Sequence, residues 1–337
     1  MNPILTWTPL TLKLRNPFRL SSGVSDTRQV FLIHLTDDSG WGESAIPPYY
    51  GVDQNAMIAC WEAAAQKQQP LPDEPEEITG WVGTMGPAPA RCALELALYD
   101  RIARGRGLPL YALLGLPKPQ PKPTSFTIAI DTPEEMARMA KDISDYPIIK
   151  IKLGSEGDDA RLAAIRAARP DARLRVDPNA GWTLDQALQR IPALEKFGLE
   201  MIEQTLPRPE IAGLGEIQRH TSIPVVADES VQTLEDVERL AQAGVQGINL
   251  KLMKVGGLTP ALRILQWAGE LGLRVMLGCM IETSLGVTAM AHLSGLAEWL
   301  DLDAPILITN DPFEGVTYDK HAFIYVPDRP GIGVKLR

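Results

Sequence analysis

The feature that most constrains the fold of this chain is a recurrence, about every 25 residues, of short apolar runs that end in an ionisable side chain. Runs such as 147–152 and 224–228 are rich in β-branched residues. The residues that end five successive runs are separated by 25, 26, 25 and 23 positions: Lys152, Asp177, Glu203, Asp228 and Lys251. One strand, one helix and two short loops occupy about this length. The recurrence therefore predicts alternating strands and helices, with these side chains gathered at one mouth of a barrel.

Residues 124–310 continue this alternation throughout. Strand-like runs lie at about 124–130, 147–153, 173–177, 200–203, 223–228, 247–251, 273–278 and 299–302. Thr132-Pro133 and Thr233-Leu234, each followed by acidic residues, are typical helix starts. Eight strands with helical crossovers favour a barrel over an open doubly wound sheet, and no Gly-x-Gly-x-x-Gly follows the first strand. We therefore predict an α/β barrel domain over 124–310.

Residues 1–115 follow a different pattern, in which strands precede helices. Apolar and polar residues alternate in Ile4–Arg15 and Val30–Thr36, which predicts antiparallel strands, and helical stretches follow at about 53–68 and 89–104. This order is typical of an α+β domain.

A proline-rich segment separates the two regions. Residues 117–123 contain four prolines, which predicts a stiff extended linker and a domain boundary. The last stretch, 311–337, is rich in proline and glycine, and we expect it to pack back against the N-terminal domain.

Composition narrows the class of protein. The net charge of −9 argues against nucleic acid, whose recognition needs a basic surface. No run of about 18 apolar residues is present, so we expect no membrane span. The three cysteines, Cys60, Cys92 and Cys279, lie far apart without metal-ligand spacing and are expected to be reduced thiols. The first residues lack the pattern of a signal peptide, and we expect a cytoplasmic protein.

Three carboxylates are expected to end three consecutive strands. Asp177, Glu203 and Asp228 would form an all-oxygen site, which Mg²⁺ favours. No histidine or cysteine lies at a comparable strand end, so zinc is not expected. Each acid taken singly could instead cap the helix that follows it, but the regular spacing of all three favours a metal site.

Lysines flank these carboxylates on both sides along the chain. Lys150 and Lys152 share one face of their strand because side chains alternate, and their like charges should lower the pKa of at least one of them. A lysine shifted in this way can act as a general base. Lys251 comes four strands later, from the opposite side of a barrel. Lysines on the two sides of the barrel could remove a proton from one face of a substrate carbon and return a proton to the other face. A proton α to a carboxylate is too weakly acidic to leave without a base. Mg²⁺ would stabilise the enediolate that forms when the proton is removed.

These residues resemble a known family. The motifs Lys150-Ile-Lys152, Asp177-Pro-Asn-Ala-Gly-Trp182, Glu203-Gln204, Ala227-Asp-Glu-Ser230 and Lys251-Leu-Met-Lys-Val-Gly-Gly257 together resemble the muconate-lactonizing subgroup of the enolase superfamily. The resemblance covers nearly the whole chain. It implies a (β/α)7β-type barrel with an N-terminal α+β capping domain, Lys152 and Lys251 as the acid/base pair, and Lys150 as their electrostatic aid. It also implies that Asp177, Glu203 and Asp228 bind Mg²⁺.

A further motif resembles the dipeptide epimerases of this superfamily. Asp301-Leu-Asp303 follows the eighth strand and is similar to the Asp-x-Asp that binds the α-ammonium group of the substrate. A dipeptide carries an ammonium group, which the paired acids would bind, and a carboxylate, which the metal ion would bind. A loop-capping role for Asp301 and Asp303 stays open. Glu282 in Gly278-Cys-Met-Ile-Glu282 could face the pocket or simply begin the next helix.

Two capping-domain loops are expected to read the substrate side chain. The first, residues 20–27, contains no lysine or arginine between Arg19 and Arg28, so a glutamyl side chain has no cationic partner unless a flanking arginine bends inward. The second, residues 46–51, is aromatic and uncharged and includes Tyr50. We therefore expect a preference for apolar or small side chains over Ala-Glu, and Asp26 could admit a cationic one.

The sequence thus predicts a Mg²⁺-dependent dipeptide epimerase acting by 1,1-proton transfer at the Cα of the C-terminal residue. N-acylamino acid racemase and o-succinylbenzoate synthase are rivals on the same scaffold, but their substrates lack the ammonium group that Asp301 and Asp303 would bind, and a cycloisomerase is a weaker rival for the same reason. A metal-dependent hydrolase would want histidine ligands, and His34, His220, His292 and His321 lie at no barrel-strand end. A non-catalytic binding protein would not need both bases and all metal ligands. Assembly into a homo-oligomer is left open, as are the preferred dipeptide and the pathway.

Overall fold

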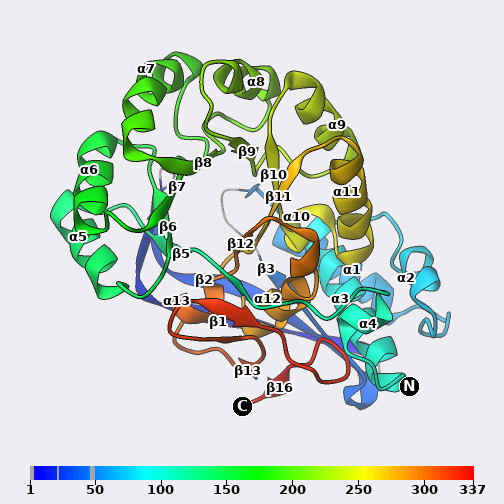
Figure 1. Ribbon diagram of the computed structural model, residues 1–337. Coiled ribbons are helices and arrows are strands. Elements are labelled where there is room, and N and C mark those ends of the chain that lie inside the picture. Colours follow the sequence, from blue (N-terminus) through cyan, green and yellow to red (C-terminus); the bar gives the residue numbers. More distant parts are fainter. Residues whose placement is uncertain (1–3, 21–22, 46–49) are drawn as a thin grey trace.

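The computed structural model describes residues 4–20, 23–45 and 50–337, and it contains an N-terminal sheet with helices beside a parallel barrel (Figure 1). The N-terminal sheet is antiparallel, in the order β1-β2-β3. Its strands are β1 (Leu5–Leu20), β2 (Gly23–Leu35) and β3 (Trp41–Ala45). The helices that follow are α1 (Gln54–Ala65), α2 (Pro75–Val82), α3 (Ala88–Gly105) and α4 (Leu110–Leu113).

The hairpin of β1 and β2 extends well beyond the strands that alternation predicted. The register shifts between Lys13 and Phe18, around Pro17. Proline has no N–H to donate to a ladder, so an irregularity at this place follows from the sequence. The two-residue alternation breaks there, and for that reason the pattern reveals only the first part of the strand. Much of the expected loop 20–27 is therefore strand, while residues 21–22 of that loop lie outside the described residues.

The barrel is an eight-stranded parallel sheet in sequential order, β5 to β12. Its strands are β5 (Phe126–Ile128), β6 (Ile148–Lys152), β7 (Arg173–Asp177), β8 (Leu199–Glu203), β9 (Val225–Ala227), β10 (Gly247–Leu250), β11 (Arg274–Gly278) and β12 (Trp299–Asp301). The Ser125 N–H donates a hydrogen bond to the Leu300 carbonyl at 3.2 Å, which brings the two ends of the sheet together. The predicted barrel is confirmed.

Helices follow the strands on the outside of the barrel (Figure 1). They are α5 (Pro133–Asp142), α6 (Asp158–Ala168), α7 (Leu184–Leu194), α8 (Ile211–Arg219), α9 (Leu234–Ala243), α11 (Leu258–Glu270) and α12 (Ser284–Ala291), with short helices α10 (Leu252–Val255) and α13 (Ala304–Leu307) at the mouth. The side chains of Thr132, Thr183 and Thr233 each accept a hydrogen bond from the first turn of the helix that follows.

The interior of the barrel below the mouth is filled by side chains rather than open. Met201, Val226, Met276 and Trp299 form a separate buried cluster from four strands. Arg175 is also buried, and its guanidinium bonds to Glu200 at 2.6 Å and to the Leu300 carbonyl at 2.7 Å. Because this layer closes the barrel from below, chemistry is confined to the carboxyl ends of the strands.

The C-terminal residues lie across both regions of the molecule. Short strands β13 (Phe313–Glu314) and β16 (Lys335–Leu336) pair with each other, while β14 (Thr317–Tyr318) and β15 (Phe323–Tyr325) form a sheet with β4 (Lys122–Pro123) from the proline-rich segment. The Ile332 N–H donates to Asp100 of α3 at 2.7 Å, so the tail does contact the N-terminal domain. The division into 1–115 and 124–310 stays a prediction.

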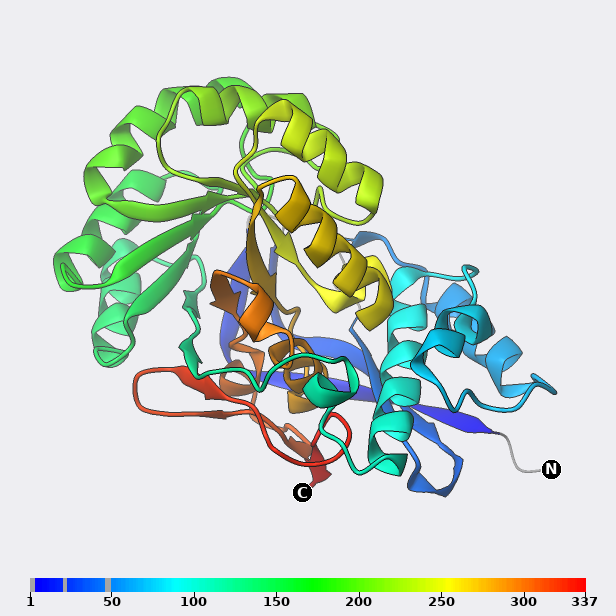
Figure 2. The same cartoon turned by 45° about the vertical axis from the view of Figure 1, so that its right-hand side comes forward.

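The N-terminal domain packs against the mouth side of the barrel. Helix α3 contacts α10 and α11, and β3 contacts α12. In Figure 2 one end of α11, in gold, reaches α3, in cyan. Within the described part of the chain, no helix is both long and apolar enough to cross a bilayer.

Candidate active site

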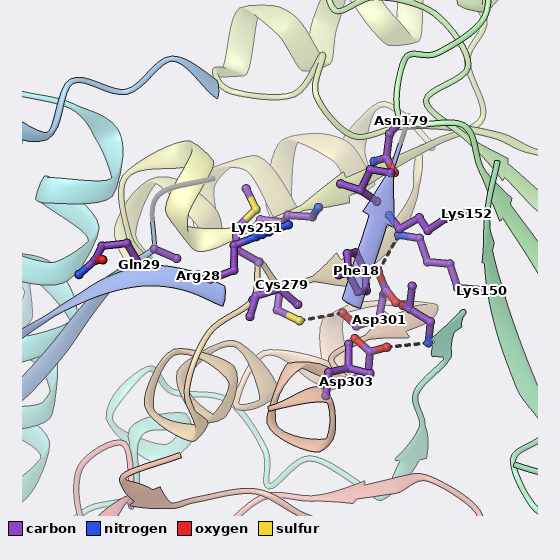
Figure 3. A pocket seen from close by; sticks show the side chains of 16 residues that line it. Phe18, Arg28, Gln29, Lys150, Lys152, Asn179, Lys251, Cys279, Asp301 and Asp303 are labelled. Carbon is purple, nitrogen blue, oxygen red and sulfur yellow. Dashed lines mark hydrogen bonds and ion pairs between the residues drawn. The ribbon is translucent and has the colours of Figure 1, made fainter. Parts of the chain in front are cut away.

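The ionisable residues of the recurrence lie at the carboxyl ends of the barrel strands, and several of them line one cavity. Lys150 and Lys152 come from β6, and Lys251 follows β10. Three strands separate β6 from β10 in the sheet, so the lysines enter from different sides (Figure 3). The lining residues are Phe18, Leu20, Arg28, Gln29, Ala45, Thr127, Lys150, Lys152, Asn179, Lys251, Cys279, Met280, Ile281, Asp301, Asp303 and Leu307.

Carboxylates surround the β6 lysines. Lys150 Nζ lies 2.7 Å from both Asp301 Oδ2 and Glu203 Oε2, and 3.1 Å from Asp177 Oδ2. Lys152 Nζ lies 2.6 Å from Asp177 Oδ2. Burial alone would lower the pKa of Lys150, but Asp301, Glu203 and Asp177 together raise it well above its ordinary value. The like charge of the neighbouring lysine therefore does not lower the pKa of Lys150, because three carboxylates contact its ammonium group directly.

A second charged group lies across the mouth around Asp228. Lys251 Nζ lies 2.7 Å from Asp228 Oδ2, and Lys254 Nζ lies 2.6 Å from Oδ1. Burial would raise the pKa of Asp228, but Lys251 and Lys254 hold it well below its ordinary value. Lys254 also donates to the Asn249 carbonyl at 2.9 Å and to the Asp228 carbonyl.

Lys254 is a residue that the sequence analysis missed as a participant. It stands three residues after Lys251 within the quoted motif, and that one-turn spacing on α10 was the available signal. Asn249 was also missed. From β10, its side-chain Nδ2 donates a hydrogen bond at 2.9 Å to Glu203 Oε1 at the end of β8.

The three predicted metal ligands, Asp177, Glu203 and Asp228, suit a hard divalent cation by their chemistry. All three are buried at the ends of adjacent strands and offer only oxygen. Burial, with the charge of Asp177 nearby, raises the pKa of Glu203 to about 8, so additional positive charge would stabilise its ionised form. In residues 4–20, 23–45 and 50–337, no three acidic, histidine or cysteine side chains are grouped as closely as metal ligands, and these carboxylates contact lysines instead.

Asp301 and Asp303 differ in their surroundings although they are two residues apart. Asp301 accepts from Ser125 Oγ at 2.7 Å besides pairing with Lys150, and despite burial these partners lower its pKa to about 2. Asp303 accepts from the Thr127 N–H at 2.7 Å, and burial together with the charge of Asp301 raises its pKa to about 7. A cationic group beside Asp303 would therefore relieve an uncompensated buried charge.

Three predicted substrate-binding residues are not among the described residues that line this cavity. Asp26 is exposed on β2 and does not line the cavity. Tyr50 borders a separate hollow with Arg208 and Lys254, while residues 46–49 of its loop lie outside the described residues. Glu282 is buried behind the cavity wall, where its Oε1 accepts from the Met280 N–H at 2.6 Å.

The β1–β2 hairpin supplies part of the cavity wall, of which the sequence analysis had placed only Leu20 in a substrate-reading loop, residues 20–27. Phe18 and Leu20 come from β1, and Arg28 and Gln29 come from β2 (Figure 3). Arg28 had been considered only as a flanking residue that would have to bend inward. Both strands of this hairpin therefore reach the cavity.

Comparisons with known proteins agree over nearly the whole chain. A family model described as enolase C-terminal domain-like matches residues 132–337. The chain is 35% identical to an L-Ala-D/L-Glu epimerase of Bacteroides thetaiotaomicron, covering 98% of this chain and 87% of that protein. It is 35% identical to a hydrophobic dipeptide epimerase of Roseobacter litoralis, covering 96% of each. The solved structure of a dipeptide epimerase from Cytophaga hutchinsonii, complexed with Mg and D-Ala-L-Val, matches with a TM-score of 0.90 at 30% identity, covering 99% of this chain and 96% of that one.

Proposed function

This chain belongs to the enolase superfamily, and on that premise we propose that it is a Mg²⁺-dependent dipeptide epimerase, an isomerase that inverts the Cα of the C-terminal residue. One observation carries the proposal. Lys152 and Lys251, from opposite parts of the barrel, line the same cavity as Asp301 and Asp303. Two bases facing one carbon are what a 1,1-proton transfer requires, because the proton leaves one face and returns to the other.

Asp177, Glu203 and Asp228 would hold the Mg²⁺. When bound, the ion would supply positive charge beside the substrate carboxylate, where negative charge develops as the proton leaves. Lys150, which contacts both Asp177 and Glu203, would add to that positive charge.

The lysines would carry out the proton transfer itself. In one direction Lys152 Nζ would take the α-proton while the Lys251 ammonium gives its proton to the opposite face, and in the reverse direction the roles exchange. Each is held by a carboxylate, Asp177 at 2.6 Å and Asp228 at 2.7 Å respectively. These contacts support a fixed approach of both groups to the cavity.

Asp303 favours a dipeptide over an N-acylated amino acid as the substrate. Its buried carboxylate, with a pKa raised to about 7 by burial and by Asp301, gains a compensating charge from an α-ammonium group and none from an N-acyl group. The racemase and synthase rivals are less favoured for that reason.

The preference against Ala-Glu stays a prediction, and Arg28 now bears on it. Phe18, Leu20, Ile281 and Leu307 give the cavity apolar walls that suit an apolar side chain. Arg28 lines the same cavity, so a glutamyl side chain would have one cationic partner there.

The test is mass-spectrometric measurement of deuterium uptake at Cα in D₂O, with Mg²⁺, over a dipeptide library. Lys152→Ala and Lys251→Ala should each abolish epimerisation, while exchange of one epimer survives in each variant. Normal epimerisation by either variant would overturn the two-base assignment. Alanyl-glutamate as the fastest substrate would overturn the side-chain prediction, and an Arg28→Met variant would then show whether Arg28 is responsible.

A further inference from the structure

Two glycines after Lys251 shape the contact between the barrel and the capping domain. Gly256 and Gly257 both adopt positive φ, +100° and +127°, which residues with side chains rarely adopt. A β-carbon on Gly257 would lie 2.5 Å from Glu95 Oε2, and one on Gly256 would lie 3.1 Å from the Arg91 guanidinium. This turn therefore leaves room for two side chains of α3.

Glu95 binds the start of the barrel helix α11. Its side chain is buried, and Oε2 accepts a hydrogen bond from the Thr259 N–H at 2.9 Å. The N-cap position of α11 is Gly257, which has no side chain to satisfy the N–H groups of the first turn. A carboxylate of the capping domain thus performs the capping that the barrel helix itself lacks.

Neighbouring residues on α3 strengthen this contact. Arg91, Glu95 and Tyr99 are four residues apart and so share one face of the helix. The Tyr99 hydroxyl lies 2.9 Å from Thr259 Oγ1. The face of α3 that carries them is thereby held to the first turn of α11.

The same turn is joined to Lys251 by a short rigid element. Lys251 is the N-cap of α10, and Gly256 is its C-cap, with its N–H bonded to the Leu252 carbonyl at 3.0 Å. The single helical turn of α10 therefore separates Lys251 from the glycine turn that contacts Glu95. Helix α10 also packs on α3. A shift of the glycine turn would move Lys251 and Lys254 together.

We propose that Glu95, through the Gly256–Gly257 turn and α10, is a positioning residue for Lys251. It acts through the backbone and touches no reacting atom. Lys152 lies on β6, on the other side of the mouth, where its ion pair is with Asp177 of the neighbouring strand β7. The capping domain thus sets the position of one of the two bases more than that of the other.

This inference rests on the proposed two-base epimerisation, and its signature is asymmetric. Exchange of the α-proton with D₂O is measured separately for the two epimers of one dipeptide substrate, in the full chain with Mg²⁺. Lys251→Ala first identifies the epimer whose exchange depends on Lys251. Glu95→Ala should then slow exchange of that epimer by about tenfold to a hundredfold more than exchange of the other, because a displaced base loses rate steeply.

Two further variants separate positioning from folding. Glu95→Asp keeps the charge but shortens the side chain, and it should show the same asymmetry if Glu95→Ala does not fold. Glu95→Gln keeps an oxygen for the Thr259 N–H and should largely restore exchange. Asp100→Asn is the matched control, because Asp100 lies buried on the same helix but accepts from the Trp41 and Ile332 N–H groups, at 3.0 and 2.7 Å. It should slow both epimers equally if it slows either.

Equal slowing of both epimers by Glu95→Ala or Glu95→Asp, or no slowing, would overturn the positioning role. If the unaltered protein exchanges neither epimer of any dipeptide, the proposed function fails instead.

Discussion

A buried pair of glutamates makes the stability of this protein depend on pH, and Glu282→Gln isolates that effect. Glu43 of β3 and Glu282 are both buried where the N-terminal sheet meets the start of α12. A β-carbon on Gly286 would lie 2.3 Å from Glu282 Oε2 and 3.1 Å from Glu43 Oε2, so the two carboxyl groups are close neighbours. Burial, and then the charge of Glu43, raises the pKa of Glu282 to about 8.

The sign and size of the effect follow from this pKa. The ordinary value is 4.5, so between the two values the folded state binds a proton that the unfolded chain has released. Stability from this proton is present below about pH 4.5 and is lost as the pH rises toward 8. For one such proton, the free energy of unfolding falls by at most roughly 1.4 kcal/mol per pH unit, and by about 3.5 kcal/mol between about pH 5 and pH 8 because the slope flattens near each of the two pKa values.

The charged and titratable groups around Glu282 come from several elements. Glu43 faces it from β3, Cys92 from α3 and Lys251 from the end of β10, while Asp311 acts on Glu43. Burial raises the pKa of Glu43 itself to about 7 against hydrogen bonds from Thr283 and Gly286. Removing the Glu282 carboxylate also removes a like charge beside Glu43. The free energy of unfolding of the variant should therefore lose at least the pH dependence that one proton causes.

The assay is urea unfolding followed by tryptophan fluorescence, in EDTA, from about pH 5 to pH 8. The free energy of unfolding of Glu282→Gln should fall less steeply with pH than that of the unaltered protein, by about 1 kcal/mol per pH unit. Glu298→Gln is the control. A hydrogen bond from Arg274 lowers the pKa of Glu298, so that group is ionised in both states over this range and the slope should not change. Parallel curves for the unaltered protein and Glu282→Gln would refute the reasoning.

Three other predictions concern the site and its supporting turn. Asp303→Asn should raise KM for dipeptides about tenfold, since a charged hydrogen bond to ammonium is lost, and an unchanged KM would exclude that role. Gly257→Ala should destabilise the protein by about 1–3 kcal/mol in urea unfolding, because of its φ of +127° and the contact with Glu95, whereas Gly269→Ala in α11, with nothing within 4 Å, should stabilise it by about 0.5–1 kcal/mol. Similar effects of the two alanines would contradict this. Mg²⁺ at about a hundred times its Kd should stabilise the unaltered protein by about 3 kcal/mol and Glu203→Gln by less, and an equal rise in Tm for both would remove Glu203 from the ligands.

The barrel could be predicted from the sequence because each of its parts has a local signal. The strand runs at 173–177 and 200–203 differ from β7 and β8 by at most one residue. A strand and its helix follow one another along the chain, so their spacing is visible without knowledge of the fold. The same spacing placed ionisable residues at the carboxyl ends of strands, and parallel strands bring those ends together.

The contacts between distant segments had no such signal. Glu95 and Thr259 are 164 residues apart, and Glu43 and Thr283 are 240 apart. No periodicity links these positions, so neither glutamate could be assigned from the pattern. For the same reason the raised pKa of Lys150 could not be predicted, since its partner Asp301 lies 151 residues further along the chain.

The charges at the mouth argue for a divalent cation independently of any likeness to other proteins. Six buried carboxylates, those of the predicted ligands and of Glu229, Asp301 and Asp303, meet four buried lysines, and Arg28 also lines the cavity. A general base must be neutral when it accepts its proton, which leaves three ammonium groups and the Arg28 guanidinium against the six acids. Burial and neighbouring acids already raise the pKa of Glu203 to about 8 and that of Asp303 to about 7. One Mg²⁺ offsets the two excess negative charges, whereas a dipeptide zwitterion adds none. A metal ion is therefore the component that would let one lysine act as a base while all six acids stay ionised.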